Sequence, residues 1–209
     1  VKRHNIRSPQ GIDELSYYLI SNSGNEYSYT NLSKMIKIQS VNTIKKYLSY
    51  LEESFIFFSV KRFSAKVKEQ INFNKKSYCI DNGFIYAKAF KTSQSIGKLY
   101  ENIVAQELKR KELNNHIKLF YWKNVQQEEV DFVIQEGNNV SELMQVCYDL
   151  KDNETKKREI RALLKAAKEL KCSNLLIITS NHESEEHVEW FDLKGKIKFV
   201  PLWKWLLND

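Results

Sequence analysis

Cysteine, glycine and proline are scarce in this sequence, which has three Cys, six Gly and two Pro in 209 residues. The odd number and wide spacing of Cys79, Cys147 and Cys172, with no CxxC pair, exclude a disulfide framework and a zinc site, and they favour a reducing cytoplasm. No apolar run approaches the roughly 18–20 residues of a membrane helix. The basic opening VKRHNIRSPQG has no apolar segment behind it, so it is not a secretory signal. We therefore expect a cytoplasmic protein with no membrane contact.

Hydrophobic residues make up 42% of the chain and charged residues 28%, which is typical of a packed globular protein. The net charge of +7 is unevenly distributed. Residues 1–96 carry 15 Lys and Arg against 7 Asp and Glu, whereas residues 97–209 carry 18 against 19. The basic half is the better candidate for contacting phosphates, and the alternative is an ordinary solvated surface. Because the chain starts at Val1 rather than Met, we expect a fragment of a longer protein.

The basic half has the pattern of three helices followed by a strand hairpin. Apolar residues at helical spacing predict helices over 9–22, 31–38 and 41–54. FIFFSVKRF (55–63) and KKSYCIDNGFIYA (75–87) are expected to pair as strands with a basic loop between them and a turn at Asp81-Asn82-Gly83. This order predicts a winged helix that binds duplex DNA, and the alternative is protein contact or interdomain packing. The residues we expect to contact DNA are Asn42, Thr43, Lys45, Lys46, Lys61 and Arg62.

The second half alternates helices and strands. A long helix is expected over 93–113, and a second one over 152–170. The remaining apolar runs predict an α/β layer arrangement with two domains, 1–92 and 93–209. KGKIKFV is expected to be an exposed edge strand, and NHESEEHVEW an exposed loop. Strands are expected over 117–123, 129–135, 140–150 and 173–180, with a last one in the tail. The 173–180 segment is a continuous apolar run, as a buried parallel strand would be.

Acidic residues gather on the expected central strands. Strand alternation places Val130, Phe132 and Ile134 on one face, and Glu129, Asp131 and Val133 on the other. In-register pairing with the next strand places Asp131 beside Gln145. Glu101, at the edge of the apolar face of the helix expected over 93–113, becomes a site candidate if these acidic residues lie near it.

GKLYENIVAQEL, YWKNVQQEEVDFVI and the QVCYDL strand resemble the C-terminal region of a group of archaeal and bacterial AAA+-type ATPases. Glu101, Trp122 and Glu129-Val130-Asp131 are the most specific elements of this resemblance, which covers essentially the whole chain. It implies a winged helix-turn-helix domain followed by a PD-(D/E)xK, restriction-endonuclease-like α/β domain with a mixed central sheet. No GxxxxGK[ST] stretch occurs, so ATP and the P-loop ATPase domain would belong to another part of the protein.

The resemblance also implies a metal site, which the sequence only half supplies. Such nucleases hold Mg²⁺ with carboxylates and use a nearby lysine to stabilise charge. Glu101 and Asp131 match the carboxylates, but Gln145 stands where a third acidic residue belongs and Cys147 where the lysine belongs. Lys123 or the basic residues at 151–158 are candidates to replace that lysine.

Three hypotheses follow. The first is a DNA-binding C-terminal region of an AAA+-type ATPase with a degenerate nuclease-like domain. The second is a Mg²⁺-dependent DNA endonuclease with Glu101, Asp131 and Gln145 as metal ligands and a migrated lysine. The third is a protein-interaction scaffold without nucleic acid. Oligomeric state stays open in all three.

Overall fold

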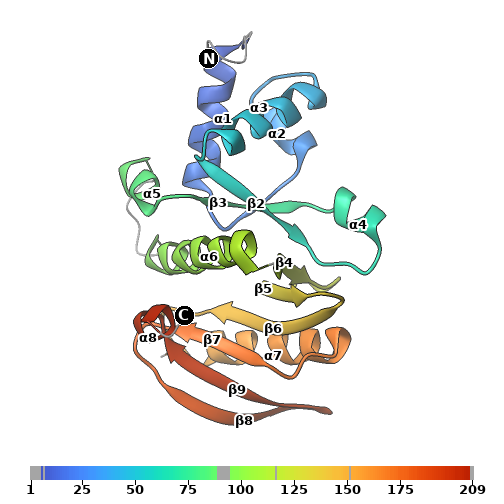
Figure 1. Ribbon diagram of the computed structural model, residues 1–209, viewed down its shortest axis with the longest axis vertical. Coiled ribbons are helices and arrows are strands. Elements are labelled where there is room, and N and C mark those ends of the chain that lie inside the picture. Colours follow the sequence, from blue (N-terminus) through green and yellow to red (C-terminus); the bar gives the residue numbers. More distant parts are fainter. Residues whose placement is uncertain (1–5, 7, 89–94, 116, 151, 208–209) are drawn as a thin grey trace.

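A computed structural model describes residue 6 and residues 8–88, 95–115, 117–150 and 152–207 (Figure 1). Helices and strands of both halves assemble around one mixed sheet. The elements are α1 (Pro9–Ser21), β1 (Glu26–Tyr27), α2 (Tyr29–Met35), α3 (Val41–Glu53), β2 (Phe57–Arg62), α4 (Val67–Asn72), β3 (Lys75–Cys79), α5 (Asn82–Lys88), α6 (Ser95–Asn115), β4 (Ile117–Lys123), β5 (Glu129–Glu136), β6 (Asn139–Val146), α7 (Asn153–Leu170), β7 (Leu175–Thr179), β8 (Ser184–Trp190), β9 (Leu193–Pro201) and α8 (Leu202–Leu207).

The sheet runs through both halves of the chain in the order β1-β3-β2-β4-β5-β6-β7-β9-β8. Its two parts meet where β2 lies parallel to β4, and only Lys61 with Phe120 and Arg62 with Tyr121 are paired there. β6, β7 and β9 are parallel neighbours as well, and the pairs other than these and β2–β4 are antiparallel. The sheet is therefore mixed, and it crosses the boundary that we expected between residues 92 and 93.

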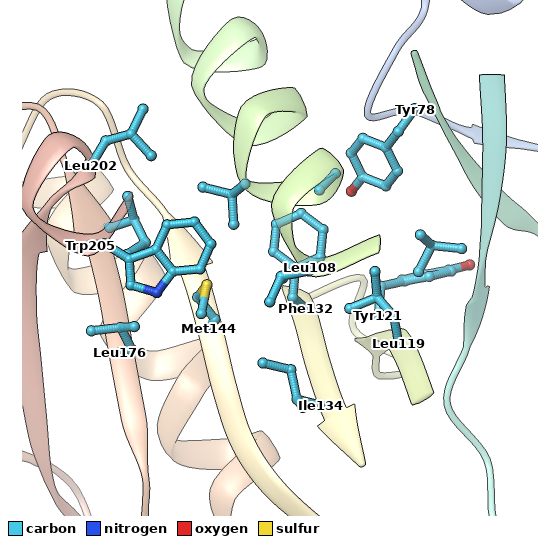
Figure 2. Close-up of a cluster of buried hydrophobic side chains, with 14 of the residues drawn as sticks. Tyr78, Leu108, Leu119, Tyr121, Phe132, Ile134, Met144, Leu176, Leu202 and Trp205 are labelled. Atoms are coloured by element: carbon cyan, nitrogen blue, oxygen red, sulfur yellow. The ribbon is translucent and has the colours of Figure 1, made fainter. Parts of the chain in front are cut away.

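Each face of the sheet has its own apolar core. On one face α6 and α8 pack against the strands, with Leu108, Phe132, Met144 and Trp205 at the centre (Figure 2). On the other face α7 supplies Leu163 and its neighbours. The 173–180 run was expected to be a buried parallel strand, and β7 is one, because it is covered by both cores.

The first three helices form a separate core beside this sheet, drawn at the top of Figure 1. Leu15, Leu32, Ile44 and Leu48 are at most 3% exposed there. Ser8, Ser28 and Ser40 cap α1, α2 and α3 by accepting a backbone N–H at each helix start. The helices predicted over 9–22, 31–38 and 41–54 are thus present, with the second one starting two residues earlier.

Four expectations need correction. The loop between β2 and β3 contains a helix, α4, and the Asp81-Asn82-Gly83 turn leads into α5 rather than back into a strand. Residues 181–190, expected as a loop, mostly form strand β8. That strand is the edge of the sheet, so β9, which holds the KGKIKFV stretch, lies inside it. Glu189 and Glu185 on β8 pair with Lys194 and Lys196, which explains why lysines suit an internal strand here.

Strand alternation also fails at one place in β5. The register of β4 and β5 shifts between Phe120 and Trp122, which leaves Asp131 within the irregularity. As a result Val130 packs with Val133 on the α7 face, while Phe132 and Ile134 face α6. A bulge of this kind re-aims side chains and often marks a functional position.

Candidate functional site

The buried ammonium group of Lys76 lies among the acidic residues that the sequence indicated. Its Nζ is 3.1 Å from Oε1 of Glu101 and 3.1 Å from Oδ1 of Asp131, and it also pairs with Glu129. The Lys76 side chain is only 2% exposed. β3 brings the cation, α6 brings Glu101, and β5 brings the other two carboxylates. One cation of β3 thus joins three acidic side chains from two other elements, α6 and β5.

Further hydrogen bonds fix this cluster. The Tyr78 hydroxyl donates to Glu101 at 2.7 Å, and the Val146 N–H donates to the second oxygen of Asp131 at 3.0 Å. Gly24 has a φ of +80°, and a Cβ there would stand 3.0 Å from a Glu101 oxygen. Glycine is required at this position both for its backbone conformation and for the space the carboxylate occupies.

The charges of the cluster shift one another's protonation. Burial raises the pKa of Glu101, Lys76 lowers it and Asp131 raises it, leaving it at about 7. Burial also raises the pKa of Glu129, partly offset by Lys76. Burial lowers the pKa of Lys76, but the neighbouring anions, Glu101 first, raise it well above its usual value. Lys76 is therefore charged at any physiological pH, and Glu101 titrates near neutrality.

Lys123, the residue expected to take the role of the lysine, contacts the Lys76 cluster only through Glu129. It pairs with Glu26 from β1 and lies 3.7 Å from Glu129. It does not contact Asp131, whose cation is Lys76. The chain of charges therefore runs Glu26, Lys123, Glu129, Lys76, and it crosses from the first half of the protein to the second.

Gln145 lies next to Asp131, as the pairing pattern predicted, and both ends of its amide group are hydrogen-bonded within the protein. Its amide oxygen accepts the Asp131 backbone N–H at 3.0 Å, and its amide nitrogen donates to Glu159 of α7. Burial raises the pKa of Glu159, and the charge of Asp131 raises it further. Glu159 is a buried acid of this site that sequence reasoning missed.

The other candidate cations are occupied elsewhere. Lys156 pairs with Glu186, Lys157 with Glu154, and Arg158 with Glu159. Lys151 lies outside the described residues. Cys147 stands in the expected lysine position, and burial raises the pKa of its thiol to about 12, so it stays a neutral packing residue.

The arrangement does not fit a Mg²⁺ ion. A divalent ion shared by Glu101 and Asp131 would need the space between their carboxylates, and the Lys76 nitrogen stands there. Within the described ranges, no three His, Cys, Asp or Glu side chains form a group that could hold a metal ion. Lys76 thus supplies the compensating charge that a metal provides in a nuclease.

One signal in the sequence pointed to Lys76 but is weak. Lys76 and Tyr78 alternate along an apolar strand, so both face the same side, and a lysine on the buried side of a strand needs an anion. Sequence spacing alone could not show that this side faces α6.

Buried polar contacts attach the two halves beside this cluster. Asn102 of α6 is fully buried, donates to the carbonyl of Cys79 at 3.0 Å and accepts the Cys79 N–H at 2.8 Å. It also accepts a hydrogen bond from Ser23 and donates one to Asn82. α6 is therefore fixed to β3 by directional contacts as well as by Lys76.

The residues expected to contact DNA lie on two elements. Asn42, Lys45 and Lys46 are exposed on α3, and Thr43 is half-buried beside them. Lys61 is exposed near the end of β2. Arg62 follows it, but its guanidinium group stacks on the Phe73 ring at 4.2 Å and donates to the Lys123 carbonyl, so it serves the fold.

Comparison with known proteins assigns the chain to a family. Residues 96–205 match the family described as Domain of unknown function (DUF4143), and the chain belongs to this family. DUF4143 is known as a C-terminal region of ATPase-type proteins. Residues 1–95 match a second one, Domain of unknown function (DUF8612).

Two relatives illustrate the match. An uncharacterized protein of Methanocaldococcus jannaschii, MJ1544, is 39% identical over 217 residues, covering 100% of this chain and 47% of the relative. An uncharacterized protein of Haemophilus influenzae is 23% identical over 155 residues, covering 72% of this chain and 37% of the relative. The chain thus spans less than half the length of these relatives. Among the described residues, no helix has the length and apolarity to cross a membrane.

The raised pKa of Glu101 predicts a pH-dependent stability. Its folded pKa of about 7 exceeds the usual 4.5, so the carboxyl group favours folding when protonated, and this contribution is lost as pH rises from about 4.5 to 7. Relative to Glu101→Gln, the wild-type free energy of unfolding should fall over this range by up to about 3 kcal/mol. Urea unfolding at a series of pH values measures it, and parallel curves for the two proteins would contradict the raised pKa.

Replacing the ammonium group should create a metal site in this cluster. Lys76→Met keeps the apolar stem but leaves Glu101, Glu129 and Asp131 without their cation. Mn²⁺ should then raise the melting temperature of Lys76→Met, or restore its folding, while the wild type does not respond. The double variant Lys76→Met/Asp131→Asn is the control and should lose most of the effect. An equal response of wild type and Lys76→Met would show that the ammonium group does not occupy the ion position.

Proposed function

We propose that this chain is the C-terminal DNA-binding region of an AAA+-type ATPase, in which a nuclease-like domain has lost its catalytic metal. The position of the Lys76 nitrogen, 3.1 Å from both Glu101 and Asp131, is the observation that supports the loss of the metal, and the order of elements with the exposed cations of α3 supports DNA binding. ATP would act only through a domain outside this chain. The activity of the whole protein is part of the proposal, because the chain covers 47% of the M. jannaschii relative.

Burial supports the loss of nuclease activity. A phosphodiester must reach the metal and the attacking water, but the side chains of Lys76, Glu101 and Asp131 are 2%, 16% and 10% exposed. Gln145 is the neutral metal ligand in the alternative endonuclease hypothesis, but its amide oxygen accepts a hydrogen bond from the Asp131 backbone N–H. Its amide nitrogen donates a hydrogen bond to the Glu159 carboxylate. This geometry favours a structural role for the acidic cluster.

The order of elements supports DNA binding by the first half. Helix α1, the short strand β1, helices α2 and α3, and the antiparallel pair β2 and β3 follow one another as in a winged helix. The exposed side of α3 carries Asn42, Lys45 and Lys46, which are residue types that donate to phosphates and base edges. We propose a restriction-endonuclease-like layout for the second half on the same ground, which is the order of its helices and strands.

Duplex DNA binding should depend steeply on salt. Fluorescence anisotropy with a labelled duplex should show weaker binding as salt rises from 50 to 200 mM, because each neutralised phosphate contributes about −0.9 to the log–log slope. Binding that is absent, or unchanged across this salt range, would favour the scaffold hypothesis over the proposed function.

Supercoiled plasmid should remain intact with this protein. Incubation with Mg²⁺ or Mn²⁺ should give the same background for the wild type and for Asp131→Ala, because the acidic cluster has no free centre for an ion. Metal-dependent cleavage by the wild type that Asp131→Ala abolishes would instead establish the endonuclease hypothesis.

A further inference from the structure

Three lysines meet in a groove between the first helices and the β2–α4–β3 segment. Lys45 of α3, Lys61 of β2 and Lys75 of β3 line a cavity of about 430 Å³ together with Tyr29, Thr30 and Asn72. None of the residues lining this cavity, which we call the lysine groove, is acidic. The groove therefore concentrates positive charge in a concave site.

The lysines are held close together by the fold. Lys61 and Lys75 are direct partners in the antiparallel pairing of β2 and β3. The Lys75 ammonium donates to the Tyr29 hydroxyl at 2.6 Å, and the nitrogens of Lys75 and Lys45 each lie 5.2 Å from the Tyr29 ring centroid. Tyr29 thus positions two of the three cations, through a hydrogen bond and the face of its ring.

This placement is unfavourable without an anion. Like charges directly opposite each other on antiparallel strands destabilise the pair, and elsewhere in this protein lysines are matched with carboxylates. Among the described residues, no Asp or Glu forms an ion pair with Lys45, Lys61 or Lys75. A cluster of cations that the protein itself leaves uncompensated is typical of a site whose anion is a ligand.

We propose that the lysine groove binds the phosphodiester backbone of duplex DNA, with Lys45, Lys61 and Lys75 each neutralising phosphate charge. This inference rests on the proposed function and deepens it, because it adds Lys75 and Tyr29 to the DNA site and removes Arg62 from it. Asn42 and Lys46 lie outside the residues that line the groove. They remain candidates for neighbouring contacts.

The test compares two triple variants that remove the same charge. Lys45→Gln/Lys61→Gln/Lys75→Gln empties the groove of cations, and Lys168→Gln/Lys194→Gln/Lys196→Gln removes three lysines that pair with Asp192, Glu189 and Glu185. Anisotropy with a labelled duplex should show at least about tenfold weaker binding for the groove variant. Its log–log salt slope should be shallower by about 2–3, since three phosphate contacts at about 0.9 each are lost. The control variant should bind within about twofold of the wild type.

A second measurement keeps the result independent of folding defects. Because Lys61 faces Lys75, Lys61→Gln alone should raise the melting temperature of the DNA-free protein at low salt, and the gain should shrink at high salt. Lys46→Gln, on the exposed side of α3, should leave it unchanged. A lower melting temperature for Lys61→Gln would overturn the claim that these cations lack an anionic partner in the free protein.

The outcomes separate the two proposals. Salt-dependent binding by the wild type with equal affinities for both triple variants would overturn the lysine groove and leave the proposed function standing. No duplex binding by the wild type would overturn both. Complete displacement of the duplex by millimolar adenosine monophosphate at constant ionic strength would assign the groove to a free nucleotide and overturn the strand assignment.

Discussion

The ammonium group of Lys76 has been removed almost completely from water, and such a transfer costs several kcal/mol unless anions surround the charge. Glu101 and Asp131 each lie 3.1 Å away, and Glu129 also pairs with it. These carboxylates would repel one another without the cation, so neither charge type can be buried alone. The requirement for mutual compensation therefore fixes α6, β3 and β5 relative to one another.

This cluster joins the two halves of the chain at a place where the sheet itself offers little. β2 and β4 share only two paired positions, whereas Lys76 and the Asn102 hydrogen bonds connect β3 to α6 and β5. The segments 1–95 and 96–205 match different families, yet each completes the other's buried polar groups. Charge and hydrogen bonding thus add directional contacts to the apolar core that Phe58, Val60 and Tyr78 share with α6 and β4 at this junction.

Much of the fold could be predicted from local patterns. The serine-capped helices of the first half, the apolar stripe of α7 and the pairing of Asp131 with Gln145 all follow from periodicity and capping. Strand β8 escaped prediction because its alternating charges have few apolar residues to signal a strand. The register shift in β5 also escaped, since no local pattern shows where two strands lose their alignment.

The sequence by itself indicated Glu101 and Asp131 as acidic residues of one site, a cysteine rather than a lysine at position 147, and the basic character of the first half. Only the tertiary structure decided that Lys76, 55 residues before Asp131 in the chain, provides the cation. Long-range ion pairs depend on how elements pack, and sequence spacing carries no information about that packing. The physical reason is that a buried charge selects its partner by proximity in the folded protein, where water no longer compensates it.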